Sequence, residues 1–149
     1  MKIAQALSLR KSQEKMLLNL IQTINTVAYD PDENPDQLIT DYFSLAEKQT
    51  DIIYQIECAN LHYTLDYKGE VFTLSRARLV RDRLIKDTEH LSSLPRAKKK
   101  SVSYGGSEVQ TLQLDRNKLK TVIADFSRRA RELDDKLQEA NWLNELELP

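Results

Sequence analysis

The sequence predicts a mainly α-helical protein: an elongated antiparallel bundle of four long helices with coiled-coil-like seams and a small β-hairpin insertion. Three segments carry apolar residues at alternating spacings of three and four, which is the seam of a helix that packs lengthwise against another helix. Only 3 Gly and 4 Pro occur among 149 residues, which also favours helix. This length is typical of one domain, so we expect residues 1–149 to form a single helical domain.

A helical hairpin is expected over residues 3–65. Its first helix should run from Ile3 to about Ala28 and its second from Pro35, capped by Asn34, to Tyr63 or Leu65. Two prolines in the intervening stretch cannot continue a helix, and so short a loop makes the two helices antiparallel. The first seam comprises Ile3, Ala6, Arg10, Gln13, Leu17, Leu20, Ile24 and Val27. The second comprises Leu38, Tyr42, Leu45, Gln49, Ile52, Ile56, Ala59 and Tyr63.

Four polar residues interrupt apolar stripes of this hairpin. We expect Gln49 and Asn60 to bond across a seam and so fix the register of the helices. Arg10 and Gln13 instead indicate that the N-terminal half of the first helix faces a wet surface or another subunit.

The rest of the chain reads as alternating short and long elements. Gly69 marks a turn before an extended segment at 70–74, and a helix over 75–94 follows, capped by Ser75 and stopped by Pro95. Residues 96–114 are loop-rich, with a β-hairpin expected around Gly105-Gly106 that places Val102 opposite Val109. The last helix is expected over 115–141 with Asp115 as its cap, and a tail of 142–149 completes the chain. The predicted seam of this helix comprises Leu119, Ile123, Phe126, Ala130, Leu133, Leu137 and Ala140.

Composition excludes several classes of function. The net charge of −1 provides no overall field that attracts nucleic acid or a membrane, and the single cysteine, Cys58, excludes an internal disulfide. No catalytic, di-iron, zinc, EF-hand or phosphate-loop pattern occurs. We therefore expect a protein that is not an enzyme and has no cofactor, metal or small-molecule substrate. Neither a signal peptide nor a membrane span is evident, so we expect a cytoplasmic protein that does not bind membranes.

Four short motifs resemble a known family. They are Met1–Leu7, Gly69–Leu74 leading to Arg81-Asp82, Arg131–Asp134, and Gln138–Trp142, of which the Glu-Ala-Asn-Trp block is the most distinctive. Together they resemble a small bacterial all-helical family of unknown function, some members of which are labelled septicolysin. The resemblance implies a helical, oligomeric, intracellular protein without an assigned activity.

Surplus apolar residues beside the two seams predict self-association. These flanking positions are Ile39, Ala46, Ile53, Leu7, Ile21 and Ala28. We therefore interpret the chain as a non-enzymatic structural or interaction protein that forms a homo-oligomer. Trp142 has two interpretations: it folds back on its own bundle after a helix capped by Asn141, or it docks with Leu143, Leu146 and Leu148 into a neighbouring subunit.

A basic segment supports an alternative function. Residues 76–100 hold nine basic residues against three acidic ones, a local excess of +6. The alternative is a nucleic-acid-binding accessory protein, in which phosphates are contacted by Arg78, Arg81, Lys98, Lys99 and Lys100. The competing interpretation is a solvated helix face and loop, because the arginines point around much of the helix.

Overall fold

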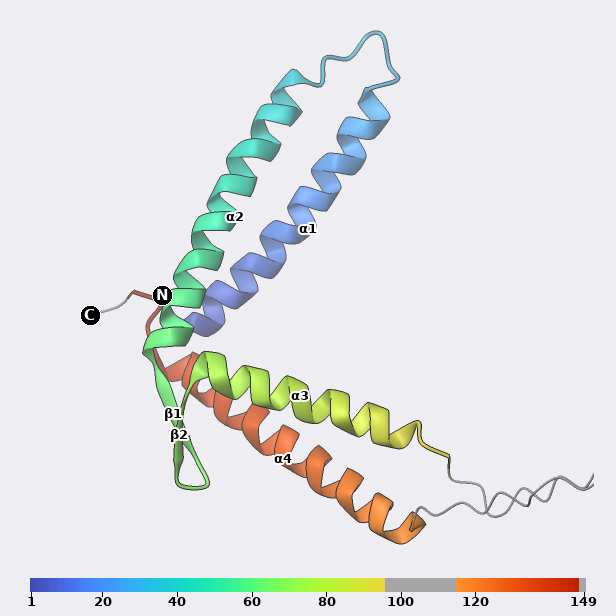
Figure 1. Cartoon of the computed structure of the whole chain (residues 1–149). Coiled ribbons are helices and arrows are strands. Elements are labelled where there is room, and N and C mark those ends of the chain that lie inside the picture. The colour runs from blue at the N-terminus through green and yellow to red at the C-terminus, as the bar shows by residue number, and fades with distance from the viewer. Residues whose placement is uncertain (96–114, 148–149) are drawn as a thin grey trace, which may run out of the picture. The chain divides into compact units, whose positions relative to one another are not determined.

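A computed structural model describes residues 1–95 and 115–147. Among these residues the elements are α1 (Ile3–Val27), α2 (Asp36–His62), β1 (Thr64–Tyr67), β2 (Glu70–Thr73), α3 (Leu74–Ser92) and α4 (Arg116–Leu143) (Figure 1). The chain divides into two compact units. The first is Met1–Arg76 with Lys136–Pro149, and the second is Ala77–Asp135. The mainly helical fold with a small two-stranded hairpin agrees with the sequence, although α3, at 19 residues, is shorter than the other helices.

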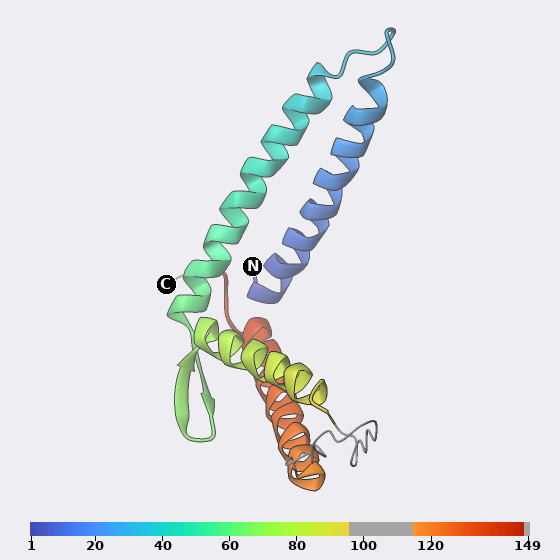
Figure 2. The same ribbon diagram turned by 45° about the vertical axis from the view of Figure 1, so that its right-hand side comes forward.

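The first two helices form the expected antiparallel hairpin. They lie side by side in both views (Figures 1 and 2). Every predicted seam position of both helices is buried or half-buried, from Ile3 to Val27 in α1 and from Leu38 to Tyr63 in α2. The spacing of apolar residues therefore identified correctly which side of each helix faces its partner.

Helix α2 begins at Asp36, one residue later than the predicted start at Pro35. Pro35 is the residue that precedes α2, and its carbonyl accepts the helical hydrogen bond from Ile39. The Asn34 side chain still serves the start of the helix, because its Oδ1 accepts a hydrogen bond from the Asp36 N–H at 3.0 Å.

A β-hairpin follows α2 directly, where the sequence predicted one extended segment. Strand β1 pairs antiparallel with β2, from Thr64 opposite Thr73 to Tyr67 opposite Glu70. The two-residue turn, Lys68-Gly69, has positive φ angles at both positions, 52° and 81°, as a type I′ turn requires. Helix α2 ends at His62, before the predicted end at Tyr63 or Leu65, because the residues after Tyr63 form strand β1.

Helices α3 and α4 start at capping side chains. Thr73 Oγ1 accepts a hydrogen bond from the Arg76 N–H at 3.2 Å, so Thr73 takes the role predicted for Ser75. Asp115 Oδ1 accepts the N–H groups of Asn117 and Lys118 at 2.9 and 3.2 Å, which confirms it as the cap of α4.

Helices α3 and α4 both contribute buried apolar residues to the second unit. Its most buried residues are Ala77, Leu84, Ala130 and Leu133. The predicted seam of α4 is confirmed, because all seven of its residues, from Leu119 to Ala140, are buried or half-buried. The β-hairpin predicted around Gly105-Gly106 lies outside the described residues.

Side chains from the two ends of the chain share the core of the first unit. Its most buried residues are Ile3, Ala6, Ile52, Ile56, Ala59, Leu65, Tyr67, Phe72, Leu74, Leu137, Ala140 and Leu146. The tail is held by backbone pairing with the start of the chain, since the Ile3 N–H donates to Asn144 O at 3.2 Å and the Leu146 N–H donates to Met1 O at 2.7 Å. Lys2 Nζ adds an ion pair with Glu145 at 2.7 Å and a hydrogen bond to Leu143 O at 2.8 Å.

Candidate functional site

The outer half of the α1–α2 hairpin has no core of its own. From residue 14 to residue 51, all of which the structure describes, no side chain is fully buried. The fully buried positions of the two helices are instead confined to the other end, at Ile3, Ala6 and Gln13 of α1 and from Ile52 to Asn60 of α2. Helices draw most of their stability from packed apolar faces, so packing within one copy stabilises the outer half of the hairpin only weakly.

One side of this hairpin carries several large exposed apolar side chains among polar ones such as Glu14 and Thr50. In an antiparallel pair of right-handed helices, the residue that follows each seam position points to the same side from both helices. The large side chains on that side are exposed by 38–66%, and we call them the apolar face: Leu18, Ile21, Ile39, Phe43 and Ile53. The prediction had included Ile21, Ile39 and Ile53. It had missed Leu18 and Phe43, although each directly follows a seam residue.

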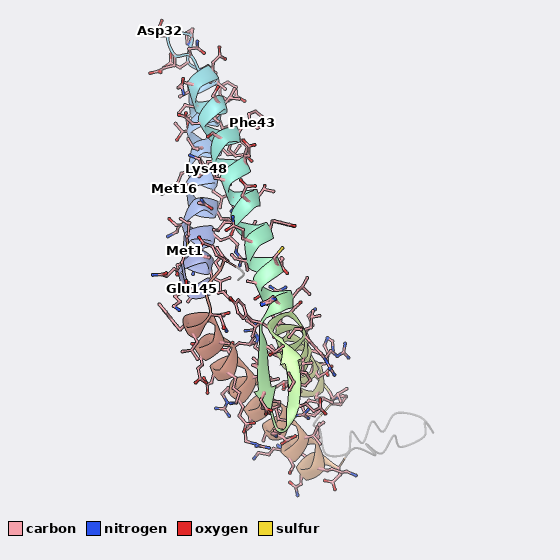
Figure 3. All side chains as sticks on the ribbon, turned by 90° about the vertical axis from the view of Figure 1, so that its left-hand side faces the viewer. Met1, Met16, Asp32, Phe43, Lys48 and Glu145 are labelled. Carbon is pink, nitrogen blue, oxygen red and sulfur yellow. The ribbon has the colours of Figure 1, made fainter. Side chains whose placement is uncertain are left out.

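The other side of the hairpin is mostly polar. The residues that precede seam positions include Ser12, Asn19, Thr23, Asp41, Lys48, Asp51 and Gln55, with Leu9 and Met16 as the large apolar exceptions. Phe43 and Met16 lie on opposite sides of the hairpin in Figure 3. The exposed apolar side chains are therefore concentrated on one face.

A polar residue interrupts the seam between α1 and α2. Gln13 is 9% exposed, and its Oε1 atom has no hydrogen-bond partner among the described residues. An unpaired buried polar group costs about 1–3 kcal/mol, so this position weakens the hairpin further. The seam residue Gln49 is half-buried and Asn60, which follows the seam residue Ala59, is buried, while their role in fixing register stays a prediction.

The predicted contact residues near the C-terminus separate into two groups. Helix α4 continues past Asn141 to Leu143, and Asn144 ends it, since its side-chain amide donates to Ala140 O at 2.9 Å. Trp142 is 62% exposed and does not fold back on its own unit, because it lies two positions beyond the seam residue Ala140. Leu143 is also exposed, at 66%, and both remain available to a partner.

The prediction that Leu146 contacts a neighbouring subunit is wrong. This residue is only 3% exposed, because its backbone pairs with Met1 and its side chain enters the core of the first unit. It is therefore a core residue and not a contact residue. Leu148 lies outside the described residues.

The arginines of α3 are largely occupied by partners in their own unit. Arg81 bonds to Asp134 of α4 at 2.6 Å and to Asp82 at 2.9 Å, and Arg83 pairs with Asp87 at 2.9 Å. Partial burial lowers the pKa of Arg81, but the hydrogen bonds that its guanidinium donates to the carboxylates of Asp82 and Asp134 outweigh this effect and hold that pKa above its ordinary value.

The structure describes Arg78 but not the three lysines of the predicted basic strip. Arg78 is half-buried and has an interaction of its own, and Lys98, Lys99 and Lys100 lie outside the described residues. The phosphate-binding strip therefore stays a prediction, with Arg81 already paired to two carboxylates.

A groove of about 660 Å³ lies between α3 and α4 in the second unit. Ile85 and Ala130 contribute its apolar surface, and the charged side chains around it include the paired Arg81, Asp82 and Asp134. Across residues 1–95 and 115–147, no group of three or more His, Cys, Asp and Glu side chains is placed to hold a metal ion. Within the same ranges, none of the helices combines the length and apolar character needed to cross a membrane.

Comparison with known proteins gives a family without an assigned role. A family model described as "Family of unknown function (DUF6847)" matches residues 10–146. A crystal structure of a functionally unknown conserved protein from Corynebacterium diphtheriae has the same fold, with a TM-score of 0.81, 24% sequence identity and 99% of each chain covered. No curated protein matches the chain. Neither description mentions septicolysin, so that label stays a prediction.

Proposed function

We propose that this chain, which belongs to the DUF6847 family of unknown function, is a non-enzymatic interaction protein that self-associates through the apolar face of its α1–α2 hairpin. The partner is a second copy of the chain. The role of the protein is then structural, and it depends on contact between the apolar faces of two copies.

The observation that carries this proposal is the coreless outer half of the hairpin. A pair of helices buries only one stripe of each helix, and here even that stripe stays half-exposed from residue 14 to residue 51. Two such hairpins packed face to face would form four helices around a shared interior, which is the usual way such helices are stabilised. The large side chains of the apolar face would then leave water.

The composition of the face also supports a protein partner. Ile21, Ile39 and Ile53 project from two helices toward one side, and Phe43 is 66% exposed there. Contiguous exposed apolar side chains of this size mark interaction sites more often than random surface. Aromatic anchors such as Phe43 contribute strongly when an interface buries them.

Charge substitutions on the two faces provide the test. Phe43→Glu and Ile21→Glu should each weaken self-association by about 2 kcal/mol or more, roughly thirtyfold in the dissociation constant, because each copy buries a charge. Met16→Glu is the matched control, since it places the same charge on the same hairpin but on the polar side. Size-exclusion chromatography with light scattering measures the mass of each variant, and circular dichroism checks that the helices remain.

Two results would overturn the proposal. One is a wild-type chain that stays monomeric at every accessible concentration. The other is a Met16→Glu variant that dissociates as readily as Phe43→Glu, which would place the contact elsewhere on the hairpin.

Nucleic-acid binding remains the alternative but is not proposed. The ion pairs of Arg81 and Arg83 with carboxylates of their own unit reduce the positive charge that α3 offers to phosphates. Titration with RNA and with duplex DNA at two salt concentrations tests it, and a steep loss of affinity with salt would revive it.

A further inference from the structure

The β1–β2 hairpin is a sheet of only two strands, so each strand has one edge that pairs with no other strand among the described residues. A hydrogen bond from the Leu74 N–H to Tyr63 O, at 3.0 Å, forms the rung of the ladder nearest to α2. Rungs of an antiparallel pair recur at every second residue of a strand. The backbone N–H and C=O groups of Thr64 and Asp66 lie between rungs, and they therefore point away from β2.

A groove of about 310 Å³ lies along this edge, between β1 and the last turns of α4. Both of its walls belong to the first unit. Its lining residues are Thr64, Leu65 and Asp66 of β1 and Lys136, Glu139, Ala140, Leu143 and Asn144 at the end of α4. The unpaired backbone groups of β1 therefore face a concave site, of a size that holds a small ligand or a few residues of peptide.

The backbone of this edge determines what kind of partner fits. N–H and C=O groups that repeat along a strand edge are matched by those of a second extended backbone, about 4.8 Å away. Helix α4 closes the far side of the groove, so one extended segment fits between β1 and α4, whereas the two-stranded sheet of a second copy does not. The occupant is therefore a short stretch of extended peptide.

The side chains of the groove specify the peptide further. Its charged residues have both signs, with Asp66 and Glu139 against Lys136. They offer no large net charge to a partner, so a strongly acidic or strongly basic peptide gains little there. Leu143 is 66% exposed in the same wall and is available to an apolar side chain. A peptide of low net charge with at least one large apolar residue is complementary to this lining.

We propose that this groove binds an extended segment of low net charge from a partner protein, which adds a third strand along Thr64 and Asp66 and places an apolar side chain against Leu143. Such pairing also stabilises the hairpin, since a sheet of two strands is marginally stable by itself. The inference goes beyond self-association, because it concerns another surface and another partner, and neither depends on the other.

Peptides selected from a phage-displayed library of random eight-residue sequences against the full-length chain provide the probe. In an added strand, only every second peptide N–H faces β1. Methylation of one peptide nitrogen at a time should therefore weaken binding at least tenfold at alternate residues, which isothermal titration calorimetry measures. A library without a binding sequence, or losses that do not alternate, would overturn the proposal.

Two proline substitutions test whether β1 is the paired edge. Thr64→Pro removes an N–H that faces the groove and leaves the rungs intact, and Tyr63 already has the extended conformation that proline requires before it (φ −79°, ψ 150°). It should weaken peptide binding about tenfold. Val71→Pro, the matched control, removes the outward N–H of the residue opposite Asp66 on β2 and should leave the affinity unchanged. Equal affinities for the two variants would contradict pairing along β1.

Leucine substitutions give a readout that leaves the backbone of the strand unchanged, and circular dichroism checks that every variant is folded. Leu143→Glu should weaken peptide binding at least tenfold, because it replaces the apolar contact by a charge. Leu79→Glu is its control, since Leu79 is equally exposed, at 65%, but lies in the second unit. Phe43→Glu should weaken self-association and leave the peptide affinity unchanged. Peptides that lose affinity with Phe43→Glu and not with Leu143→Glu would occupy the apolar face, which would overturn this proposal while self-association stands.

Discussion

Leu146 and Trp142 lie four residues apart near the end of the chain, and their exposures are opposite. Leu146 is 3% exposed in the core of the first unit, whereas Trp142 is 62% exposed on the outer side of α4. Residue type alone ranks tryptophan as the stronger anchor. Position along the chain, and not residue type, determines which of the two side chains is buried. Trp142 lies two places past the seam residue Ala140, whereas the backbone of Leu146 is paired with Met1.

Alanine substitutions at Leu146 and Trp142 should differ strongly in their effect on the free energy of unfolding. Leu146→Ala should lower the free energy of unfolding by about 2 kcal/mol, the lower end for a buried leucine because the tail can relax. Trp142→Ala should change it by less than about 0.5 kcal/mol, as expected for an exposed position. Urea unfolding followed by circular dichroism measures both. Equal losses for the two variants would contradict the packing described for the tail.

Glu145 links the stability of the chain ends to pH. A hydrogen bond from Lys2, joined by one from the α-amino group, holds the pKa of Glu145 below its ordinary value of 4.5. Because the folded pKa is depressed, the ion pair contributes fully above pH 4.5 and is lost as the pH falls through the lower folded value.

Glu145→Gln should therefore destabilise the protein at neutral pH, and its difference from wild type should shrink as the pH falls below 4.5. Thermal unfolding over a pH series measures this difference. Glu47→Gln, at an exposed position of α2, is the control and should show no such convergence. A difference that stays constant down to the lowest pH would contradict the role given to Glu145.

Among the elements, the helices were predictable and the β-hairpin was not. A spacing of three and four identifies the buried side of a helix over many residues, so the seams from Ile3 to Val27 and from Leu119 to Ala140 were predicted correctly. Strand β1 has only four residues, Thr64–Tyr67, and follows a helix without an intervening break. So short a run carries no periodicity, and its identity depends on pairing with β2.

The turn of this hairpin provides a test of its geometry. Gly69→Ala should cost about 1 kcal/mol, since φ is +81° and a Cβ there would meet no neighbouring atom, which leaves the backbone as the source of the cost. Lys68→Asn should instead stabilise by up to about 0.5 kcal/mol, because asparagine adopts the left-handed conformation more readily than lysine. Urea unfolding measures both, and a neutral Gly69→Ala would contradict the type I′ turn.

For the candidate site, the sequence located the correct helices but not the full face. Ile21, Ile39 and Ile53 were identified as surplus apolar residues, whereas Phe43 and Leu18 were overlooked. Exposure depends on which neighbours are present. The pattern of one helix does not reveal that, among the described residues, no third element covers the outer half of the hairpin. The pairing of Arg81 with Asp134, 53 residues apart, is likewise a result of folding that no local pattern contains.

In the whole molecule, the described residues leave the outer half of the α1–α2 hairpin without a core. Residues 14–51 contribute no fully buried side chain, although Leu18, Ile21, Ile39 and Phe43 lie exposed on one side of the hairpin. Association would supply a buried interior for this part of the hairpin. The stability of the outer half would then depend on contact with a second copy.

Sedimentation equilibrium of the wild-type chain over a series of micromolar concentrations tests this claim most directly. If two copies pair through the apolar face, the measured mass rises with concentration to twice 17.3 kDa. A mass of 17.3 kDa that does not change with concentration would contradict it.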